Sequence, residues 1–154
     1  MRIEHLTNQE PLICELAQLH FNEWGRFRPG ETIEARTARL RACCGIGSIP
    51  TVVVGILGSE LCGSAMLVAQ DMDAHPELTP WLAGVYVKPQ YRRHGFASAL
   101  IARIAEEARA LGAPQLYLYT DRSELLYARL GWSVLERRLY KGIGVSVMSK
   151  ELSV

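Results

Sequence analysis

The chain of 154 residues has little net charge, few cysteines and no long apolar run. Its 17 basic and 16 acidic side chains give a formal net charge of +1, which excludes a general electrostatic attraction to nucleic acid or to an anionic membrane. Its apolar runs are too short to cross a bilayer, and Met1 to His5 do not begin an apolar signal segment. We therefore expect a soluble, cytoplasmic protein with no nucleic-acid or membrane partner.

The four cysteines, Cys14, Cys43, Cys44 and Cys62, include no C-x-x-C pair. This pattern argues against a zinc site and a disulfide framework, so we expect no metal, and thiols that are free and mostly buried. The chain also lacks G-x-G-x-x-G after a strand and the loop G-x-x-x-x-G-K-S/T. A generic nucleotide-binding domain is therefore disfavoured.

What the chain does have is an ordinary globular balance of 49% hydrophobic and 21% charged residues, which predicts one domain over residues 1–154. Apolar periodicity, β-branched runs and Gly or Pro breaks predict the element order β-α-α-β-β-β-α-β-α-β-β. This order indicates a mixed α/β sheet with helices on its faces. The expected helices end near Trp24, span 32–43, 97–111 and 124–130, and alternate with strands at 51–57, 61–69, 81–87, 116–120, 132–138 and 143–149.

The first two helices carry capping signals. Thr7-x-x-Glu10 has the spacing of a capping box, and Thr32 is a candidate N-cap of the second helix. Along the second helix we expect the arginines to lie on the outer surface. These arginines are Arg36, Arg39 and Arg41.

Cationic groups gather at the junction between the strand that ends at Val87 and the longest helix. The stretch Arg92 to Ala97 contains two arginines, a histidine and Gly95, but no Ser, Thr, Asp or Asn to cap the helix. A helix start leaves amide groups unpaired and carries partial positive charge. Glycine lets the backbone approach a bulky group, so this junction favours binding of phosphate oxygens.

Two motifs give the chain a resemblance to a known family. Arg92-x-x-Gly95-x-Ala97, after a V-x-V strand, resembles the R/Q-x-x-G-x-G/A motif of the GNAT superfamily of N-acetyltransferases. Downstream, the stretch from Leu126 to Trp132, LYARLGW, is similar to the family's lYeklGF segment. The two motifs stand in register over about Trp81 to Trp132, and together they are more specific than either alone.

The resemblance implies a GNAT fold, an α/β fold with a mixed, mostly antiparallel central sheet, splayed between its fourth and fifth strands and flanked by about four helices. Acetyl-CoA would lie in the opening as a cosubstrate, with no metal. Backbone groups of the fourth strand would pair with the pantetheine arm, and the amides after it would hold the pyrophosphate. The implied cofactor-binding residues are Val85, Tyr86, Val87, Arg92, Arg93, His94, Gly95, Phe96, Ala97 and Tyr127.

The implied reaction is direct transfer of an acetyl group to a primary amine of a small molecule or peptide, without a covalent enzyme intermediate. Tyr127 matches the family tyrosine that donates a hydrogen bond or proton to the coenzyme sulfur; its alternative role is an aromatic anchor. The amide of Val85 could polarise the thioester carbonyl. The alternative function is a non-catalytic acyl-CoA sensor of the same fold. Relatives also make a homodimer through the final strands an expectation.

The general base does not follow from the resemblance, because the position of the family glutamate falls on Trp81. Acidic residues and a histidine in the preceding loop are alternatives, and so is a water that relays the proton. We take Asp71, at a strand end, and His75, whose unperturbed pKa is about 6.5, as catalytic candidates beside Tyr127. The full set in the loop is Asp71, Asp73, His75 and Glu77, each with an ordinary surface role as its alternative.

In the family, the first two helices and the loop after them shape the acceptor pocket. Acidic and aromatic groups there would suit a cationic amine, whereas arginines would suit an acidic partner. Closure of the core is the alternative role for the aromatic groups, and a small amine, an antibiotic-like polyamine and a protein N-terminus are all candidate acceptors. The residues concerned are Glu23, Trp24, Arg26, Phe27, Arg28, Glu31 and Arg36.

Overall fold

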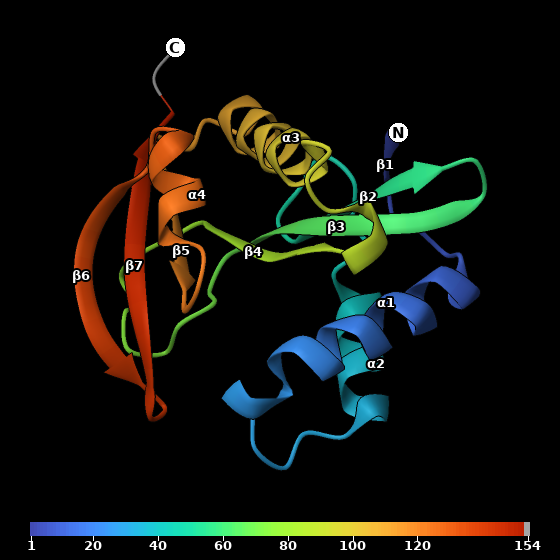
Figure 1. The fold of residues 1–154 in the computed structure, drawn as a ribbon, viewed down its shortest axis with the longest axis horizontal. Helices are drawn as coiled ribbons and strands as arrows, with labels where there is room; N and C mark the ends of the chain where they lie inside the picture. Colours follow the sequence, from blue (N-terminus) through green and yellow to red (C-terminus); the bar gives the residue numbers. More distant parts are fainter. Residues whose placement is uncertain (153–154) are drawn as a thin grey trace.

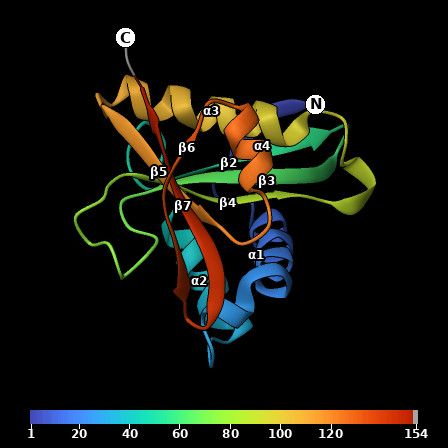
Figure 2. The same cartoon turned by 60° about the vertical axis from the view of Figure 1, so that its left-hand side comes forward.

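The computed structural model describes residues 1–152. Its seven strands form one sheet in the order β1-β2-β3-β4-β5-β7-β6, with α3 on one face and α1 and α2 on the other (Figures 1 and 2). The expected mixed sheet is thereby confirmed. The elements are β1 (Arg2–His5), α1 (Glu10–Trp24), η1 (Gly25–Phe27), α2 (Ile33–Ala42), β2 (Thr51–Leu57), β3 (Glu60–Val68), β4 (Trp81–Val87), η2 (Pro89–Tyr91), α3 (Phe96–Ala110), β5 (Gln115–Thr120), α4 (Glu124–Arg129), β6 (Ser133–Tyr140) and β7 (Ile143–Glu151).

Apolar stripes on the helices explain how the sheet is covered on both faces. On α3, residues at helical spacing from Leu100 to Ala108 are buried and pack with Val53 of β2. On α1, the buried stripe packs instead with Val52 and Val54, the neighbours of Val53 along the strand. Because side chains alternate between the two faces of a strand, β2 contributes to both cores and is buried on both faces from Thr51 to Ile56.

The fourth and fifth strands separate from each other almost at once. They run parallel and are paired in register only at Trp81↔Tyr117. Beyond β5 the sheet is continuous again, because β5 pairs with β7 from Gln115↔Glu151 to Thr120↔Ser146. The expected splay between the fourth and fifth strands is confirmed, and it opens the sheet near its centre.

A bulge bends β4 on its other side, where it pairs with β3. Ser64 pairs with Tyr86 and Met66 pairs with Ala83, so β4 holds one more residue than β3 across this step. Within the extra stretch Gly84 has a φ of +57°, in the left-handed region that glycine adopts without strain. A bulge of this kind turns a strand and re-aims the groups beside it.

Two sequence interpretations need correction at the level of helices. The Thr7 capping box is wrong: α1 begins at Glu10 with Gln9 as its N-cap, and the amide of Thr7 donates to the Gln9 side chain at 2.8 Å. Thr32 is confirmed as an N-cap, because its Oγ1 accepts from the amide of Ala35 at 3.1 Å.

The expected outer position of Arg36 is also wrong, since its side chain is buried. Arg36 Nε donates to Glu31 Oε1 at 2.6 Å, so the buried charge has a close partner. The thiols are less buried than expected: Cys62 is buried, but Cys14 is exposed. Within residues 1–152, no helix has the combined length and apolar character that crossing a bilayer requires.

Candidate active site

A cleft of about 890 Å³ occupies the opening between β4 and β5. It extends from the start of α3 to α1 and α2, so it passes through the sheet from one layer of helices to the other. His75 and His94 lie outside its wall. The sequence-predicted site residues that line it are Asp71, Val85, Tyr86, Val87, Arg92, Arg93, Gly95, Phe96, Ala97 and Tyr127.

The start of α3 forms one end of the cleft, where backbone amide groups are unpaired. Gly95 is the N-cap, with a φ of +78°, and no side chain caps the helix. The first intrahelical bond runs from the amide of Ala99 to the Gly95 carbonyl at 3.1 Å, which leaves the amides from Phe96 to Ser98 without helical partners. A Cβ added at Gly95 would meet no atom within 4 Å. Donors beside open space suit an anion such as a diphosphate.

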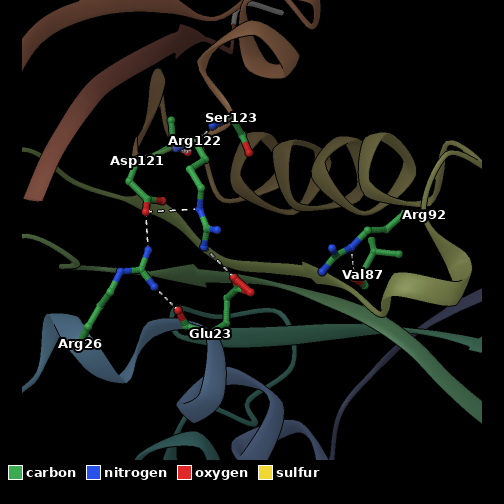
Figure 3. A network of polar contacts seen from close by, with 8 residues as sticks. Glu23, Arg26, Val87, Arg92, Asp121, Arg122 and Ser123 are labelled. Carbon is green, nitrogen blue, oxygen red and sulfur yellow. Dashed lines mark hydrogen bonds and ion pairs between the residues drawn. The ribbon is translucent and has the colours of Figure 1, made fainter.

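The two arginines before Gly95 differ in their contacts. Arg92 Nε donates to the Val87 carbonyl at 2.9 Å (Figure 3). The Arg92 guanidinium also lies 5.8 Å from the centre of the Tyr86 ring. Arg92 therefore ties the loop to β4 in addition to carrying charge. Arg93 is exposed, with a φ of +67°, and lines the cleft. His94 turns back on the loop, where its Nδ1 lies 2.8 Å from the Arg92 carbonyl.

Tyr127 reaches the cleft from α4. Its side chain is buried, and its ring packs edge-on against Trp132 with 5.9 Å between the ring centres. Burial raises the pKa of the Tyr127 phenol above its ordinary value, so the hydroxyl stays protonated at neutral pH. The residue is thus both an aromatic anchor and a proton-bearing group on the wall of the cleft.

Asp71 follows β3 and is partly buried in the cleft wall. Burial raises the pKa of its carboxyl to about 7, against the opposing effect of the charges of Arg28, Arg39 and Arg36. A carboxyl with this pKa gains and loses its proton near neutrality, as a general base must. Tyr119 lines the same cleft, and burial together with the charge of Asp71 raises the pKa of its phenol.

His75 is held away from the cleft by two carboxylates. Its Nε2 lies 2.5 Å from Glu136 Oε1 on β6, and its Nδ1 lies 3.0 Å from Glu77 Oε1. Hydrogen bonds to these carboxylates raise the pKa of His75, which favours the protonated ring. Trp81, at the position of the family glutamate, is fully buried and donates its indole N–H to the Leu78 carbonyl at 2.7 Å.

The sequence interpretation missed His20, a buried residue of α1 that lines the cleft. His20 Nε2 lies 2.9 Å from Ser64 Oγ, and that hydroxyl donates to the Gly84 carbonyl at 2.7 Å. Because the hydroxyl has only one proton, His20 must be the donor to it. Burial, with the charges of Arg36 and Arg39, lowers the pKa of His20 to about 3 and keeps it neutral. Its place on the apolar stripe of α1 was the available signal.

Charged side chains bridge the cleft between the end of α1 and the loop after β5 (Figure 3). Arg122 Nη2 donates to Glu23 Oε2 at 3.1 Å, and Arg122 Nε lies 3.5 Å from Asp121 Oδ2. From η1, Arg26 donates to the Asp121 carboxylate and to the Glu23 carbonyl. We call Glu23, Arg26, Asp121 and Arg122 the ion-pair bridge.

The remaining acceptor-side candidates divide between the cleft and its support. Trp24 and Phe27 line the cleft, and both also pack in the aromatic core cluster beneath it. Arg28 lines the cleft as well. Glu31 does not line the cleft but forms an ion pair with Arg36, which does.

Comparisons with known proteins agree with this architecture. The sequence model of the acetyltransferase (GNAT) family matches residues 15–132. A stretch of 70 residues is 34% identical to thialysine N-epsilon-acetyltransferase of Bos taurus, which covers 46% of this chain and only 36% of the bovine protein.

Solved structures resemble the fold over nearly the whole chain. An aminoglycoside 6'-N-acetyltransferase complexed with coenzyme A has a TM-score of 0.76 at 15% identity, covering 100% of this chain and 98% of that one. Ribosomal-protein-alanine N-acetyltransferase from Brucella melitensis has a TM-score of 0.74 at 18% identity, covering 98% and 99%. At such identities the likeness concerns the fold alone, but the family match extends over more than half of the sequence. The chain therefore belongs to the GNAT acetyltransferase family.

Proposed function

We propose that this protein is an acetyl-CoA-dependent N-acetyltransferase that transfers an acetyl group directly to a primary amine of a small molecule or peptide. The observation that carries the proposal is the meeting of three features in one cleft. These are the uncapped start of α3 at Gly95, the protonated phenol of Tyr127 and the carboxyl of Asp71, whose pKa is about 7. The coenzyme A complex of a protein with the same fold supports the choice of cosubstrate.

Backbone groups and the basic loop before α3 bind the acetyl-CoA. The amides of Phe96, Ala97 and Ser98, with the charge of Arg93, hold the diphosphate at the positive end of α3. The edge of β4 from Val85 to Val87, which β5 does not cover, pairs with the extended arm of the cosubstrate as a further strand would.

Acetyl-CoA supplies a thioester, whose carbonyl carbon forms the new bond to the amine nitrogen while its bond to sulfur breaks. Asp71 accepts the proton that the amine loses, and Tyr127 donates its phenolic proton to the sulfur that leaves. The bulge at Gly84 aims the amide of Val85 at the carbonyl oxygen, where it stabilises developing negative charge. His20 and Ser64 hold that bulge in place.

The binding step is tested by isothermal titration with coenzyme A. Arg93→Glu and Gly95→Val should each weaken binding by about tenfold or more, because they remove positive charge or cover the amides. Lys141→Glu, in the turn between β6 and β7, is the matched charge control and should leave affinity unchanged. Equal affinities in all four proteins would refute the diphosphate assignment.

The catalytic step is tested by release of free coenzyme A from acetyl-CoA across a panel of amines and peptides. Trp81 stands at the position of the family glutamate and cannot accept a proton, so the sensor is the alternative that this experiment must separate from the enzyme. A sensor binds acetyl-CoA and releases no thiol with any acceptor. An amine-dependent release that exceeds the rate without amine establishes the enzyme.

A further inference from the structure

Three arginines converge on the part of the cleft that lies against α2. Arg28 follows η1, Arg36 and Arg39 lie on α2, and all three line the cleft. We infer that the acceptor amine also carries an oxyanion, a carboxylate or a phosphate, which the guanidinium groups of Arg28, Arg36 and Arg39 bind. The inference rests on the proposed acetyltransferase function, because it names the class of acceptor that the enzyme takes.

The protein supplies too few carboxylates to neutralise these arginines. Glu31 serves two of them, with Oε1 2.6 Å from Arg36 Nε and Oε2 2.5 Å from Arg39 Nη1. In the described part of the chain, residues 1–152, no carboxylate oxygen lies within 4.0 Å of the Arg28 guanidinium. Three full positive charges therefore face one full negative charge.

Other acidic groups in the cleft do not make up the difference. Burial raises the pKa of Asp71 to about 7, so its carboxyl is only partly ionised near neutral pH. Glu23 and Asp121 belong to the ion-pair bridge, where Arg26 and Arg122 already balance them. The excess positive charge is thus confined to the arginine cluster.

The cluster joins one buried guanidinium, Arg36, to Arg39, whose side chain is 38% exposed, and to Arg28, which is open to water at the mouth of the cleft. Arg36 is 8% exposed, and its partner Glu31 is also nearly buried. The pKa of Arg39 is lowered first by burial and next by the charge of Arg28, so the guanidiniums repel one another. A bound oxyanion would relieve this repulsion and accept two parallel hydrogen bonds from a guanidinium.

The position of the cluster assigns the oxyanion to the acceptor and not to coenzyme A. The arginines of α2 lie on the face of the sheet opposite α3, whereas the uncapped amides for a diphosphate are at the start of α3 (Figure 1). Asp71, the proposed proton acceptor, lines the same cleft, and the charges of Arg28, Arg39 and Arg36 lower its pKa against the larger effect of burial. A polycationic acceptor would meet like charge at this point.

The experiment compares acceptors in pairs that differ only in the oxyanion. The pairs are L-lysine with L-lysinamide, amidated Glu-Ala-Ala with amidated Gln-Ala-Ala, and O-phosphoethanolamine with ethanolamine. For each pair we would measure kcat/KM from coenzyme A release, and equilibrium binding in the presence of coenzyme A without the acetyl group. The first two pairs report a carboxylate and the third a phosphate.

The wild-type protein should prefer the anionic member of at least one pair by about tenfold or more, as expected for charged hydrogen bonds. Arg28→Gln and Arg39→Gln should each reduce that preference to about threefold or less. Arg41→Gln, on α2 but exposed and outside the cleft, should keep it. The ratio within a pair cancels any effect of these substitutions on the Asp71 pKa, which acts on both members alike.

The two readouts separate failure of this inference from failure of the proposed function. Coenzyme A release with no preference in any pair overturns the inference and leaves the acetyltransferase intact. A preference in binding that Arg28→Gln abolishes, without any release of coenzyme A, supports the anion site and overturns the proposed acetyltransferase function. Absence of a preference in both readouts, or a preference for the amide members, overturns the inference.

Discussion

His20 on α1 donates a hydrogen bond to Ser64 on β3 over 2.9 Å, and the Ser64 hydroxyl donates in turn to the Gly84 carbonyl in the bulge of β4. The pair thus connects the helix layer on the acceptor side with the backbone next to Val85. A Cβ added at Gly84 would lie 3.2 Å from His20 Cε1 and 2.7 Å from Met66 Sδ, so the imidazole also packs directly on the bulge. We interpret His20 as a positioning residue for the Val85 amide.

Replacing His20 by Leu should lower kcat by about tenfold and leave coenzyme A affinity within about twofold of wild type. Leu fills the space but cannot donate to Ser64, whose oxygen then loses a buried partner at a cost of about 1–3 kcal/mol. His20→Gln retains an N–H donor and should recover most of the turnover. Equal kcat values in the Leu and Gln variants would contradict the positioning role.

Activity should rise with pH through about 7 because of Asp71. Its folded pKa is raised to about 7, so the carboxyl is protonated and inactive as a base below that pH and ionised above it. The profile of log kcat/KM for wild type should therefore bend near pH 7. Asp71→Asn should lose that bend and reduce kcat/KM by roughly 100-fold at pH 8. An unchanged bend in Asp71→Asn would assign the ionisation to another group.

The same carboxyl should reduce stability at high pH. Its pKa is about 7 in the folded protein and ordinarily 3.8, so the folded state holds the proton more tightly and the free energy of unfolding falls as pH rises between these values. The difference corresponds to at most about 4 kcal/mol, and residual solvent contact makes the real figure smaller. Asp71→Asn should therefore unfold at a higher temperature than wild type at pH 8.

The melting temperatures of Asp71→Asn and wild type should converge toward pH 4, where both side chains are uncharged in the folded state. Thermal unfolding followed by circular dichroism across this pH range measures the effect. Asp73→Asn, in the same loop but exposed, is the control and should show no such pH-dependent difference. A constant difference at all pH values would mean that the raised pKa is not its source.

Tyr127→Phe should reduce kcat by roughly 100-fold while leaving coenzyme A affinity nearly unchanged. The phenyl ring keeps the edge-on packing against Trp132, so the fold and the cleft wall are retained and only the hydroxyl is lost. Titration calorimetry and thermal unfolding check the two unchanged properties. An unchanged kcat in Tyr127→Phe would leave Tyr127 with the aromatic-anchor role alone.

Asp121→Asn should raise the acceptor KM several-fold by weakening the ion-pair bridge. The substitution removes the carboxylate that joins Arg26 of η1 to Arg122 after β5, so only the pair of Arg122 with Glu23 still links the two sides of the cleft. Because such surface pairs contribute about 0–1 kcal/mol, the melting temperature should change little. Glu34→Gln, exposed on α2, serves as control. An unchanged acceptor KM in Asp121→Asn would count against a role of the bridge in binding.

The elements that were predicted correctly carry their signal locally. The apolar stripe of α3 is visible in the residues themselves, and the turn at Lys141 and Gly142 closes the last hairpin as expected. The splay between β4 and β5 is different, because nothing in their composition reveals it. It followed from two motifs that match a family, and the homodimer implied in the same way stays a prediction.

Sequence reasoning stops where a contact outside a residue's own helix or strand decides its surroundings. Arg36 belongs to a helix rich in charge, and only the fold shows that Glu31 in the preceding loop neutralises it inside the protein. His75 has a suitable ordinary pKa, but Glu136 on β6, 61 positions along the chain, binds it. His20 interrupts an apolar stripe and so was detectable, although its partner Ser64 was not.

The single register pair between Trp81 and Tyr117 has a consequence for association between protein chains. Unpaired strand edges ordinarily recruit strands of other molecules, and proteins therefore shorten, charge or cover them. Here the open edges of β4 and β5 face each other in the interior of the sheet, with α3 packed over one side and α1 on the other. The fold thus leaves the unpaired N–H and C=O groups of these edges accessible to a narrow extended ligand, while the strand of another protein molecule cannot reach them.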